Sequence, residues 1–297
     1  GPRDAGVPGL PAVKIQTLDG IPMDYLHRVS NEAYADYVEP VSLSCRQLQY
    51  LLERRGFRAE LSLGAFDGDD MVGFVFNGTG EWGGFPTAYD TGTAVLPAWR
   101  RKGVSTRLFQ ALLPLLRGAG IEQYLLEVIR TNTGAVELYR KSGFEVSREF
   151  DYWTSDPADL TLRSGGQPNG YEVRAIATPD WDLWSTFWDF EPSWQNSQAS
   201  VSRKIGNMAV LGVFRGSELA AYGCMEFGSG DVPQLAVAPG HRRRGLATVL
   251  VSALINRVRP REFRVTNTST ESAETIAFLR SLGMDPGAGQ YEMILKL

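Results

Sequence analysis

Two stretches of this chain decide its fold: TAVLPAWRRKGVSTRLFQALLPLL, from Thr93 to Leu116, and LAVAPGHRRRGLATVLVSALINRV, from Leu235 to Val258. They align without a gap over their whole length. The matched pairs include Val95 with Val237, Pro97 with Pro239, Arg100 with Arg242, Gly103 with Gly245, and Leu108 with Leu250. Because a spacing held over such a window indicates an internal repeat, we expect one structural unit to occur twice.

A second pair of segments, LYRKSGF at 138–144 and FLRSLGM at 278–284, keeps nearly the same separation from the first pair. The length of 297 residues fits two domains of about 150 residues each. Between the copies, the segment DPADLTLRSGGQPNG is rich in Pro, Gly, Asp and Ser and indicates a linker. The predicted organisation is a tail at 1–11 that a cleaved tag could have left, an N-terminal domain at 12–155, the linker at 156–170 and a C-terminal domain at 171–297.

Within each copy the pattern predicts a strand, a loop and then a helix. The strands, Val95–Leu96 and Leu235–Ala238, end at a Pro, which cannot donate to a strand ladder. Apolar residues then recur at helical spacing, and Pro114 should kink or shorten the first helix. A strand at Tyr124–Ile129 and a shorter helix ending at Gly143 follow.

The loop between strand and helix has the composition of an anion-binding site. Gly103 has no side chain, so a phosphate could approach the backbone and the free N–H groups of the helix start. Charged donors and a small residue surround it in the first copy, and matching residues do so in the second: Arg100, Arg101, Lys102 and Ser105, then Arg242, Gly245 and Ala247. The alternative is a pair of solvated basic turns, which becomes less favoured because the pattern occurs twice in the same context.

These motifs resemble those of the GCN5-related N-acetyltransferase (GNAT) family. Its Arg/Gln-x-x-Gly-x-Gly/Ala pattern is similar to 100–105, where Ser105 is a mild departure, and to 242–247. A second family element is similar to Asn132, Ala135, Leu138-Tyr139 and Gly143-Phe144. The resemblance implies an α+β (mixed α/β) class with two tandem folds, each a mostly antiparallel twisted sheet flanked by helices, with a splayed parallel strand pair at the cofactor site.

The resemblance also implies acetyl-CoA, with its pyrophosphate on the loop and its pantetheine between the splayed strands. The backbone of Val95 and Leu96 would pair with the pantetheine, Asn132 would contact it, and the Val95 N–H would hold the oxyanion. The implied cofactor-binding residues are Val95, Leu96, Arg100, Arg101, Lys102, Gly103, Val104, Ser105, Thr106 and Asn132, and in the second copy Val237, Arg242, Arg243, Arg244, Gly245, Leu246 and Ala247.

Three residues are candidates for proton transfer. Tyr139 is placed by the resemblance near the thioester sulfur, where a leaving thiolate needs a proton. Asp90 and Glu127 are candidates for the base that deprotonates the attacking amine. Plainer interpretations stay open: a core aromatic for Tyr139, a turn residue for Asp90, and a solvated or paired strand carboxylate for Glu127.

The second copy has Leu279 where the first has Tyr139, and about Ser272 where it has Asn132. Leucine cannot donate a proton, so we expect the C-terminal domain to be non-catalytic or to shape the substrate site, with Tyr291 as an alternative donor. Trp181, Trp184 and Trp188 are spaced as a core-facing helical stripe, with an acceptor cleft as the alternative. Tyr34, Asp36, Tyr37 and Glu39 lie where this fold usually builds its acceptor wall, and a solvated helix face explains them equally well.

Composition limits the partners. A net charge of −4 argues against nucleic acid, and no apolar run reaches the length of a membrane span. No secretion signal is visible, so a cytoplasmic location is expected, and isolated Cys45 and Cys224 with two histidines leave little material for a metal site. A monomer or a homodimer is expected.

The predicted function is transfer of an acetyl group from acetyl-CoA to a primary amine of a small molecule or peptide by direct attack. The alternative is a CoA-binding sensor or regulatory protein without turnover. A nucleoside triphosphate site is disfavoured because the chain lacks a Gly-x-x-x-x-Gly-Lys-Ser/Thr motif.

Overall fold

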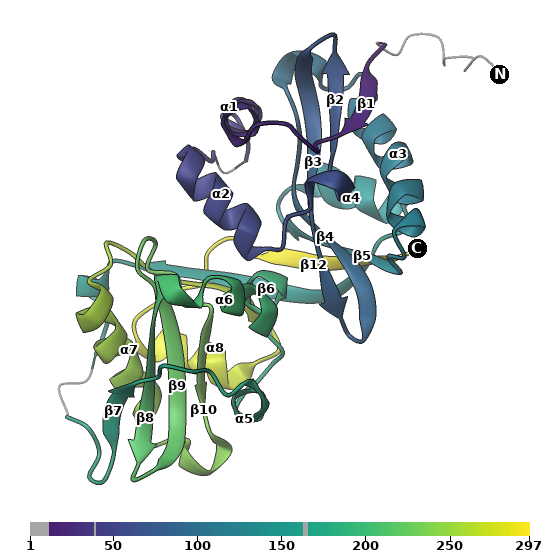
Figure 1. The fold of residues 1–297 in the computed structure, drawn as a ribbon. Helices are drawn as coiled ribbons and strands as arrows, with labels where there is room; N and C mark the ends of the chain where they lie inside the picture. Colours follow the sequence, from purple (N-terminus) through teal and green to yellow (C-terminus); the bar gives the residue numbers. More distant parts are fainter. Residues whose placement is uncertain (1–11, 39, 163–165) are drawn as a thin grey trace. The chain divides into compact units, whose positions relative to one another are not determined.

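The computed structural model describes residues 12–38, 40–162 and 166–297. The chain folds into two compact units (Figure 1). Unit 1 contains the residues up to Glu127, then Leu138–Glu145 and Met293–Leu297. Unit 2 contains Val128–Glu137 and Val146–Glu292.

Unit 1 is a twisted sheet with helices against it. Its elements are β1 (Lys14–Thr17), α1 (Met23–Tyr34), α2 (Cys45–Arg54), β2 (Leu63–Asp67), β3 (Asp70–Trp82), β4 (Phe85–Val95), α3 (Val104–Gly118), most of β5 (Gln123–Ile129), the end of α4 (Thr133–Lys141) and the end of β12 (Gln290–Lys296). The strand order is β1-β2-β3-β4-β5-β12. Strands β1 to β4 pair antiparallel, whereas β4 and β5 pair parallel.

The parallel pair β4 and β5 separates part-way along its length. Pairing covers only Thr87–Tyr89 with Gln123–Leu125. Beyond it, β4 stays with β3 but carries a bulge, because Asp90 faces Asn77 and Gly92 faces Phe76, which leaves Thr91 as the extra residue. The resemblance implied such a splayed pair.

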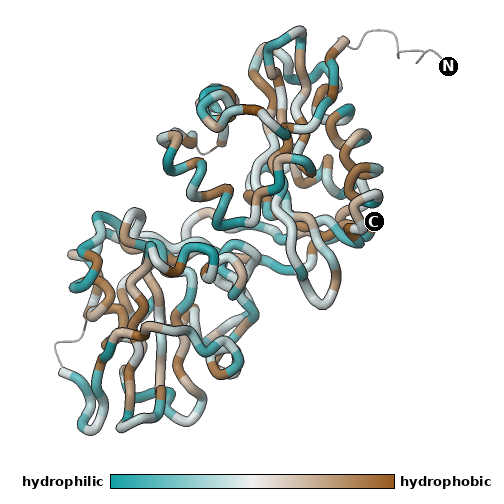
Figure 2. The backbone as a smooth tube through the Cα atoms, viewed as in Figure 1, coloured by the Kyte–Doolittle hydropathy of each residue, from teal (hydrophilic) through white to brown (hydrophobic). Residues whose placement is uncertain are grey.

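Both faces of the unit 1 sheet are covered by amphipathic helices. On α3 the residues at every fourth position are buried: Val104, Leu108, Leu112 and Leu116. The helix alternates between hydrophobic and hydrophilic stretches in Figure 2. It continues four residues past Pro114, so the expected shortening at that proline did not occur. A separate apolar cluster packs α1 and α2 against β2 and β3.

Unit 2 repeats this plan. Its elements are β6 (Glu145–Ser155), β7 (Glu172–Ala175), α5 (Trp181–Ser185), α6 (Gln198–Arg203), β8 (Met208–Arg215), β9 (Glu218–Glu226), β10 (Gln234–Val237), α7 (Leu246–Val258), β11 (Phe263–Ser269) and α8 (Ala273–Ser281). Strands β7 to β10 form an antiparallel sheet in the order β10-β9-β8-β7, and β11 pairs antiparallel with β6. The segment just before β10 meets β11 at the parallel bridge Asp231–Arg264, and no ladder between β10 and β11 occurs among the described residues, so this pair is more widely open than β4 and β5.

Three short segments belong to the unit formed mainly by the other half of the chain. Val128–Glu137 and most of β6 count with unit 2, and Met293–Leu297 counts with unit 1. A division of the chain at 156–170 assigns all three segments to the opposite half. The expected linker itself contains a short 3-10 turn at Pro157–Asp159 and the buried Leu160. Positions 163–165, the tail at 1–11 and Glu39 lie outside the described residues.

Within the part of the chain that the structure describes, no helix has both the length and the apolar character needed to cross a membrane.

Candidate active site

The two Arg-rich loops have the same backbone conformation. Gly103 caps the start of α3 with φ 75°, and Gly245 caps α7 with φ 79°. Two residues earlier, Arg101 and Arg243 also have positive φ, 57° and 63°. A positive φ is costly for a residue with a side chain, so its presence at matched positions shows that the surrounding structure imposes this turn in both units.

The turn directs main-chain N–H groups outward at the start of each helix. Neither α3 nor α7 has a hydrogen-bonded side-chain cap among the described residues. A Cβ at Gly245 would meet no atom of the described chain within 4 Å, so the space above this loop is open. Uncapped amides at the positive end of a helix, below open space, suit a phosphate group.

Arg100 and Arg242 lie away from this open space. Arg100 donates to the Val95 carbonyl at 3.0 Å and to the Ala33 carbonyl at 2.9 Å, and it forms a two-bond ion pair with Asp36. The hydrogen bonds that Arg100 donates to Asp36 lower the pKa of this carboxylate. The first Arg of the loop therefore holds the end of β4 to the end of α1.

Arg242 makes the same contacts in unit 2. It donates to the carbonyls of Val237 and Phe187 and pairs with Asp189 at 2.9 Å. The matching arrangement assigns these two arginines a structural role, and their predicted part in phosphate binding stays a prediction. Arg101 and Lys102 are exposed, as are Arg243 and Arg244.

The main-chain groups of Val95 and Leu96 point to opposite sides of β4. The Leu96 N–H donates to Val72 of β3 at 2.8 Å, so it faces into the sheet. Since successive N–H groups alternate along a strand, the Val95 N–H faces the gap between β4 and β5. In unit 2, Ala238 donates to Ala220, which leaves the Val237 N–H on the gap side.

Asp90 lies at the β4 bulge, not in a turn. Its half-buried carboxylate accepts hydrogen bonds from the Gly92 N–H at 2.9 Å and from the Thr93 hydroxyl at 2.6 Å. Burial raises the pKa of Asp90 from 3.8 to about 6, although these two bonds and one with Tyr124 oppose the increase. Asp90 is thus a carboxylate near neutral pH with more proton affinity than an exposed aspartate.

Tyr139 lies close enough to Asp90 for their charges to interact. Burial is the main cause that raises the pKa of Tyr139, and the negative charge of Asp90 is the next. Tyr37 and Tyr34 of the α1 region contribute in the same direction. The Tyr139 ring packs edge-on against Phe144 with centroids 5.5 Å apart. Asp90 and Tyr139, two of the three predicted proton-transfer residues, therefore lie within electrostatic range of each other.

Glu127 is engaged with Tyr89. Burial and then the charge of Glu127 raise the pKa of the Tyr89 hydroxyl. Asn132 lies just before α4, and its Oδ1 accepts from the Ala135 N–H at 3.3 Å. A helix-capping role thus accounts for Asn132, and its predicted contact with pantetheine stays a prediction.

Four residues of this site were not singled out as candidates from the sequence. Gly92, Thr93 and Tyr124 hold the Asp90 carboxylate, and Arg55 donates to the carbonyl and hydroxyl of Thr91 in the bulge. Only Thr93 lay inside the repeat. The others come from separate strands and helices, and no local motif marks them.

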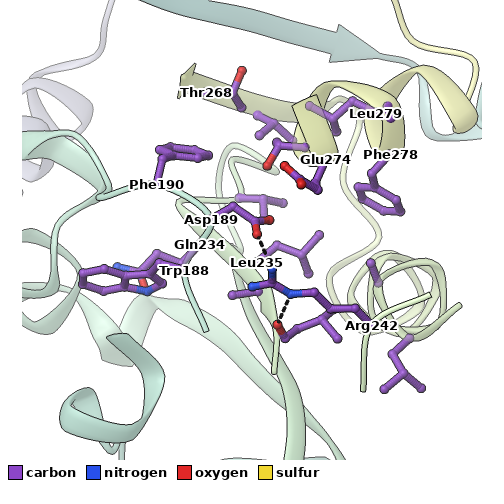
Figure 3. A pocket seen from close by; sticks show the side chains of 18 of the residues that line it. Trp188, Asp189, Phe190, Gln234, Leu235, Arg242, Thr268, Glu274, Phe278 and Leu279 are labelled. Carbon is purple, nitrogen blue, oxygen red and sulfur yellow. Dashed lines mark hydrogen bonds and ion pairs between the residues drawn. The ribbon is translucent and has the colours of Figure 1, made fainter. Parts of the chain in front are cut away.

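Unit 2 contains a cavity of about 440 Å³, which lies between β10 and β11 (Figure 3). Its walls include the loop from Arg242 to Ala247 and the start of α8. Asp189 and Glu274 face each other across it, and burial, followed by the charge of Glu274, raises the pKa of Asp189 against the opposing effect of Arg242. Trp184 is buried and Trp181 packs against its cluster, as the core-facing interpretation predicts, whereas Trp188 packs against the same cluster from beyond the end of α5. Trp188 also lines the cavity.

Comparisons with known proteins agree with this geometry. The model of the acetyltransferase (GNAT) family matches residues 26–144 and again 172–284. An N-alpha-acetyltransferase of Sulfurisphaera tokodaii is 30% identical over 116 residues, which are 36% of this chain and 68% of that protein.

Solved structures of similar fold extend over nearly the whole chain. A tandem GNAT protein from the clavulanic acid biosynthesis pathway superposes with a TM-score of 0.75 at 16% identity, over 96% of this chain and 98% of that one. A GCN5-related N-acetyltransferase from Sphaerobacter thermophilus gives 0.70 at 15% identity, over 97% and 96%. At such identities the likeness concerns the fold, and it confirms the predicted class of two tandem α+β folds. Since the family model matches both halves and together more than half of the chain, this chain belongs to the GNAT family of acetyltransferases.

Proposed function

We propose that unit 1 transfers an acetyl group from acetyl-CoA to a primary amine by direct attack. The observation that carries this proposal is the Asp90 carboxylate held at the β4 bulge, with Tyr139 within the range of its charge and the Val95 N–H of the same strand facing the gap. A base, an acid and a main-chain donor are the groups that such a transfer requires.

The loop and the gap have the chemistry to hold acetyl-CoA. The amides of Val104, Ser105 and Thr106, with the exposed Arg101 and Lys102, would bind its pyrophosphate. The gap between β4 and β5 would take the pantetheine, and bound acetyl-CoA supplies the activated acyl group. The loop residues position it and take no part in bond making.

The reaction itself would use three groups of unit 1. Asp90 accepts the proton that the nitrogen of the neutral amine loses as it attacks the acyl carbon, and a pKa of about 6 leaves Asp90 ionised near neutral pH. The Val95 N–H donates to the acyl oxygen as negative charge develops there. Tyr139, whose raised pKa keeps it protonated, donates to the departing thiolate. Glu127 is the alternative base, and its interaction with Tyr89 makes it the weaker candidate.

The second loop, from Arg242 to Ala247 with the Val237 N–H, would bind the same cofactor in unit 2, because it has the same backbone and an open cavity above it. The acceptor is proposed as a small-molecule or peptide amine. The name of the Sulfurisphaera tokodaii relative, an N-alpha-acetyltransferase, favours testing peptides with a free α-amine first.

The experiment is an amine-panel assay that follows thiol release from acetyl-CoA, run on the wild-type chain beside Gly103→Glu and Gly245→Glu. Both glycines have a positive φ, so any side chain introduced there strains the loop that would hold the phosphate. The added carboxylate also repels the negative charge of the phosphate. Loss of amine-dependent release in Gly103→Glu, with release retained in Gly245→Glu, is expected. If the wild type binds CoA by calorimetry but no amine of the panel causes thiol release from acetyl-CoA, the sensor alternative replaces this proposal.

A further inference from the structure

Unit 2 keeps the loop and the open strand pair but not the candidate acid–base groups of unit 1. When the alignment of the copies is extended, Asp90 corresponds to Val232, Glu127 to Asn267 and Tyr139 to Leu279. None of the three replacing side chains exchanges a proton near neutral pH. All three line the cavity of unit 2, so they replace the reactive groups in the place where a thioester would lie.

The side of the strand that faces the acceptor also differs between the units. In unit 1 this position is Gly92, where a Cβ would lie 3.0 Å from the Tyr34 hydroxyl. In unit 2 it is Gln234, whose buried side chain accepts from the Tyr222 hydroxyl at 2.7 Å and donates to the Asn196 carbonyl at 2.7 Å. A long side chain with two fixed partners in unit 2 thus replaces a glycine that lies against the Tyr34 hydroxyl in unit 1.

These bonds continue in both directions. The Trp188 indole N–H donates to the Tyr222 hydroxyl at 2.6 Å, and the Asn196 side-chain amide donates to the Thr266 carbonyl of β11 at 2.9 Å. Trp184 stacks on the Tyr222 ring with centroids 4.0 Å apart. The chain of bonds therefore runs from the segment after α5, across β10, to β11. A buried network whose members satisfy one another is rigid and costly to open.

We propose that this network, centred on Gln234, closes the acceptor side of unit 2, so that unit 2 binds a CoA-type nucleotide but does not pass an acyl group to an amine. The ligand class rests on the proposed function. The closure rests on the network and on the replaced residues. Unit 2 then responds to the concentration of this ligand through its own stability, because binding to the folded state alone stabilises it.

Binding by unit 2 is tested in the Gly103→Glu chain, with Thr106→Glu as the second variant if the first does not fold. Calorimetry with CoA and with acetyl-CoA should show one site per chain and a raised melting temperature, whereas adding Gly245→Glu should remove both. No heat in folded Gly103→Glu would overturn the inference whatever the activity of the wild type, so this result is separate from failure of the proposed function.

Closure is tested by substituting the residues of unit 1 into unit 2 of the Gly103→Glu chain. With Val232→Asp and Leu279→Tyr alone, no amine-dependent thiol release is expected, because Gln234 still fills the acceptor side. Adding Gln234→Gly should produce amine-dependent thiol release. The affinity for CoA should stay within about threefold of its value before that change, because the substitution removes no contact with CoA. Release while Gln234 is present, or no release in the folded triple variant that still binds CoA, would overturn the closure.

Discussion

Asp90 occupies a position in β4 where the strand is forced out of register with β3. The extra residue turns the backbone, and the Gly92 N–H and the Thr93 hydroxyl then face the same carboxylate. Three hydrogen bonds lower its proton affinity and burial raises it, and burial is the larger effect. A carboxylate of this kind suits a base that must be ionised near neutral pH and still accept a proton.

Asp90→Asn should lower kcat about a hundredfold or more, because the amide cannot accept the proton of the amine. In the wild type, kcat/KM should fall as the pH drops below about 6, where Asp90 becomes protonated. A pH–rate profile measures both. The matched control is Glu127→Gln, which should keep the acidic limb, and an unchanged profile in Asp90→Asn would contradict the assignment.

The same substitution should stabilise the protein in alkaline solution. Because the pKa of Asp90 is raised in the folded state, the folded chain binds this proton more tightly than the unfolded chain, and the ionised form destabilises the fold above pH 6. Asp90→Asn should therefore raise the melting temperature at about pH 8, and the gain should shrink as the pH falls towards 4. Differential scanning calorimetry across this range checks the sign. If the gain in melting temperature instead grows as the pH falls, burial of the charge is not the dominant effect on the pKa of Asp90.

Tyr139→Phe should lower kcat about a hundredfold and leave the KM for acetyl-CoA nearly unchanged, because only the proton donor is lost. The ring and its edge-on contact with Phe144 remain, so the melting temperature should not move. Steady-state kinetics and a thermal melt separate these effects. If kcat is unaffected, Tyr139 is a core aromatic residue only.

At the scale of elements, neighbouring residues of the loop before each helix have different roles. Arg100 binds the end of β4 to the end of α1, whereas Arg101 is exposed on the strained turn. Arg100→Ala should lower the melting temperature by several degrees, because it removes bonds worth about 1 kcal/mol each from a small unit.

Arg101→Ala is the matched variant. It should raise the KM for acetyl-CoA about tenfold, through loss of one charge near the phosphates, without lowering the melting temperature. Kinetics and thermal melts on the pair test the division. Equal losses of stability in both variants would show that the two arginines share one structural role.

The strand–loop–helix elements were predictable because their signals are local. Gly103 and Gly245 have the positive φ that a chain turning into a helix often needs, and the helical spacing after them matches α3 and α7. The role of Arg100 was not predictable, because its partner Asp36 is 64 positions away in the sequence. The bulge at Thr91 was missed for the same reason. It depends on the register with β3, and the letters Tyr-Asp-Thr-Gly alone are typical of a turn.

At the scale of the molecule, the last strand is shared between the units. The Leu297 N–H donates to the Glu122 carbonyl beside β5, and Lys296 donates to Gln123. In unit 2, Glu292 of the same strand is buried and pairs with Arg148 at 2.7 Å. Unit 1 is thus completed by Met293–Leu297 from the other end of the chain, while Glu292 of the same strand belongs to unit 2.

A chain ending at Gly289 should therefore lose more stability than the removal of an exposed terminus would cost. Loss of β12 exposes an edge of β5 in unit 1 and leaves Arg148 of unit 2 without its buried partner. Thermal melts and proteolysis should show both units weakened, and addition of a synthetic peptide of residues 290–297 should restore part of the loss. A truncated chain that melts like the wild type would contradict the shared strand.

The position of Met293–Leu297 in unit 1 also has a consequence for biosynthesis. A ribosome adds about 5–20 residues per second, so roughly ten seconds or more separate the emergence of β5 from that of its final neighbour. During that interval the N-terminal half has an unpaired strand edge and cannot finish its sheet, however early it was translated. Nascent chains should therefore depend on holding chaperones until residues 290–297 have emerged, and a stop codon placed just before residue 290 should be as damaging to the first unit as to the second.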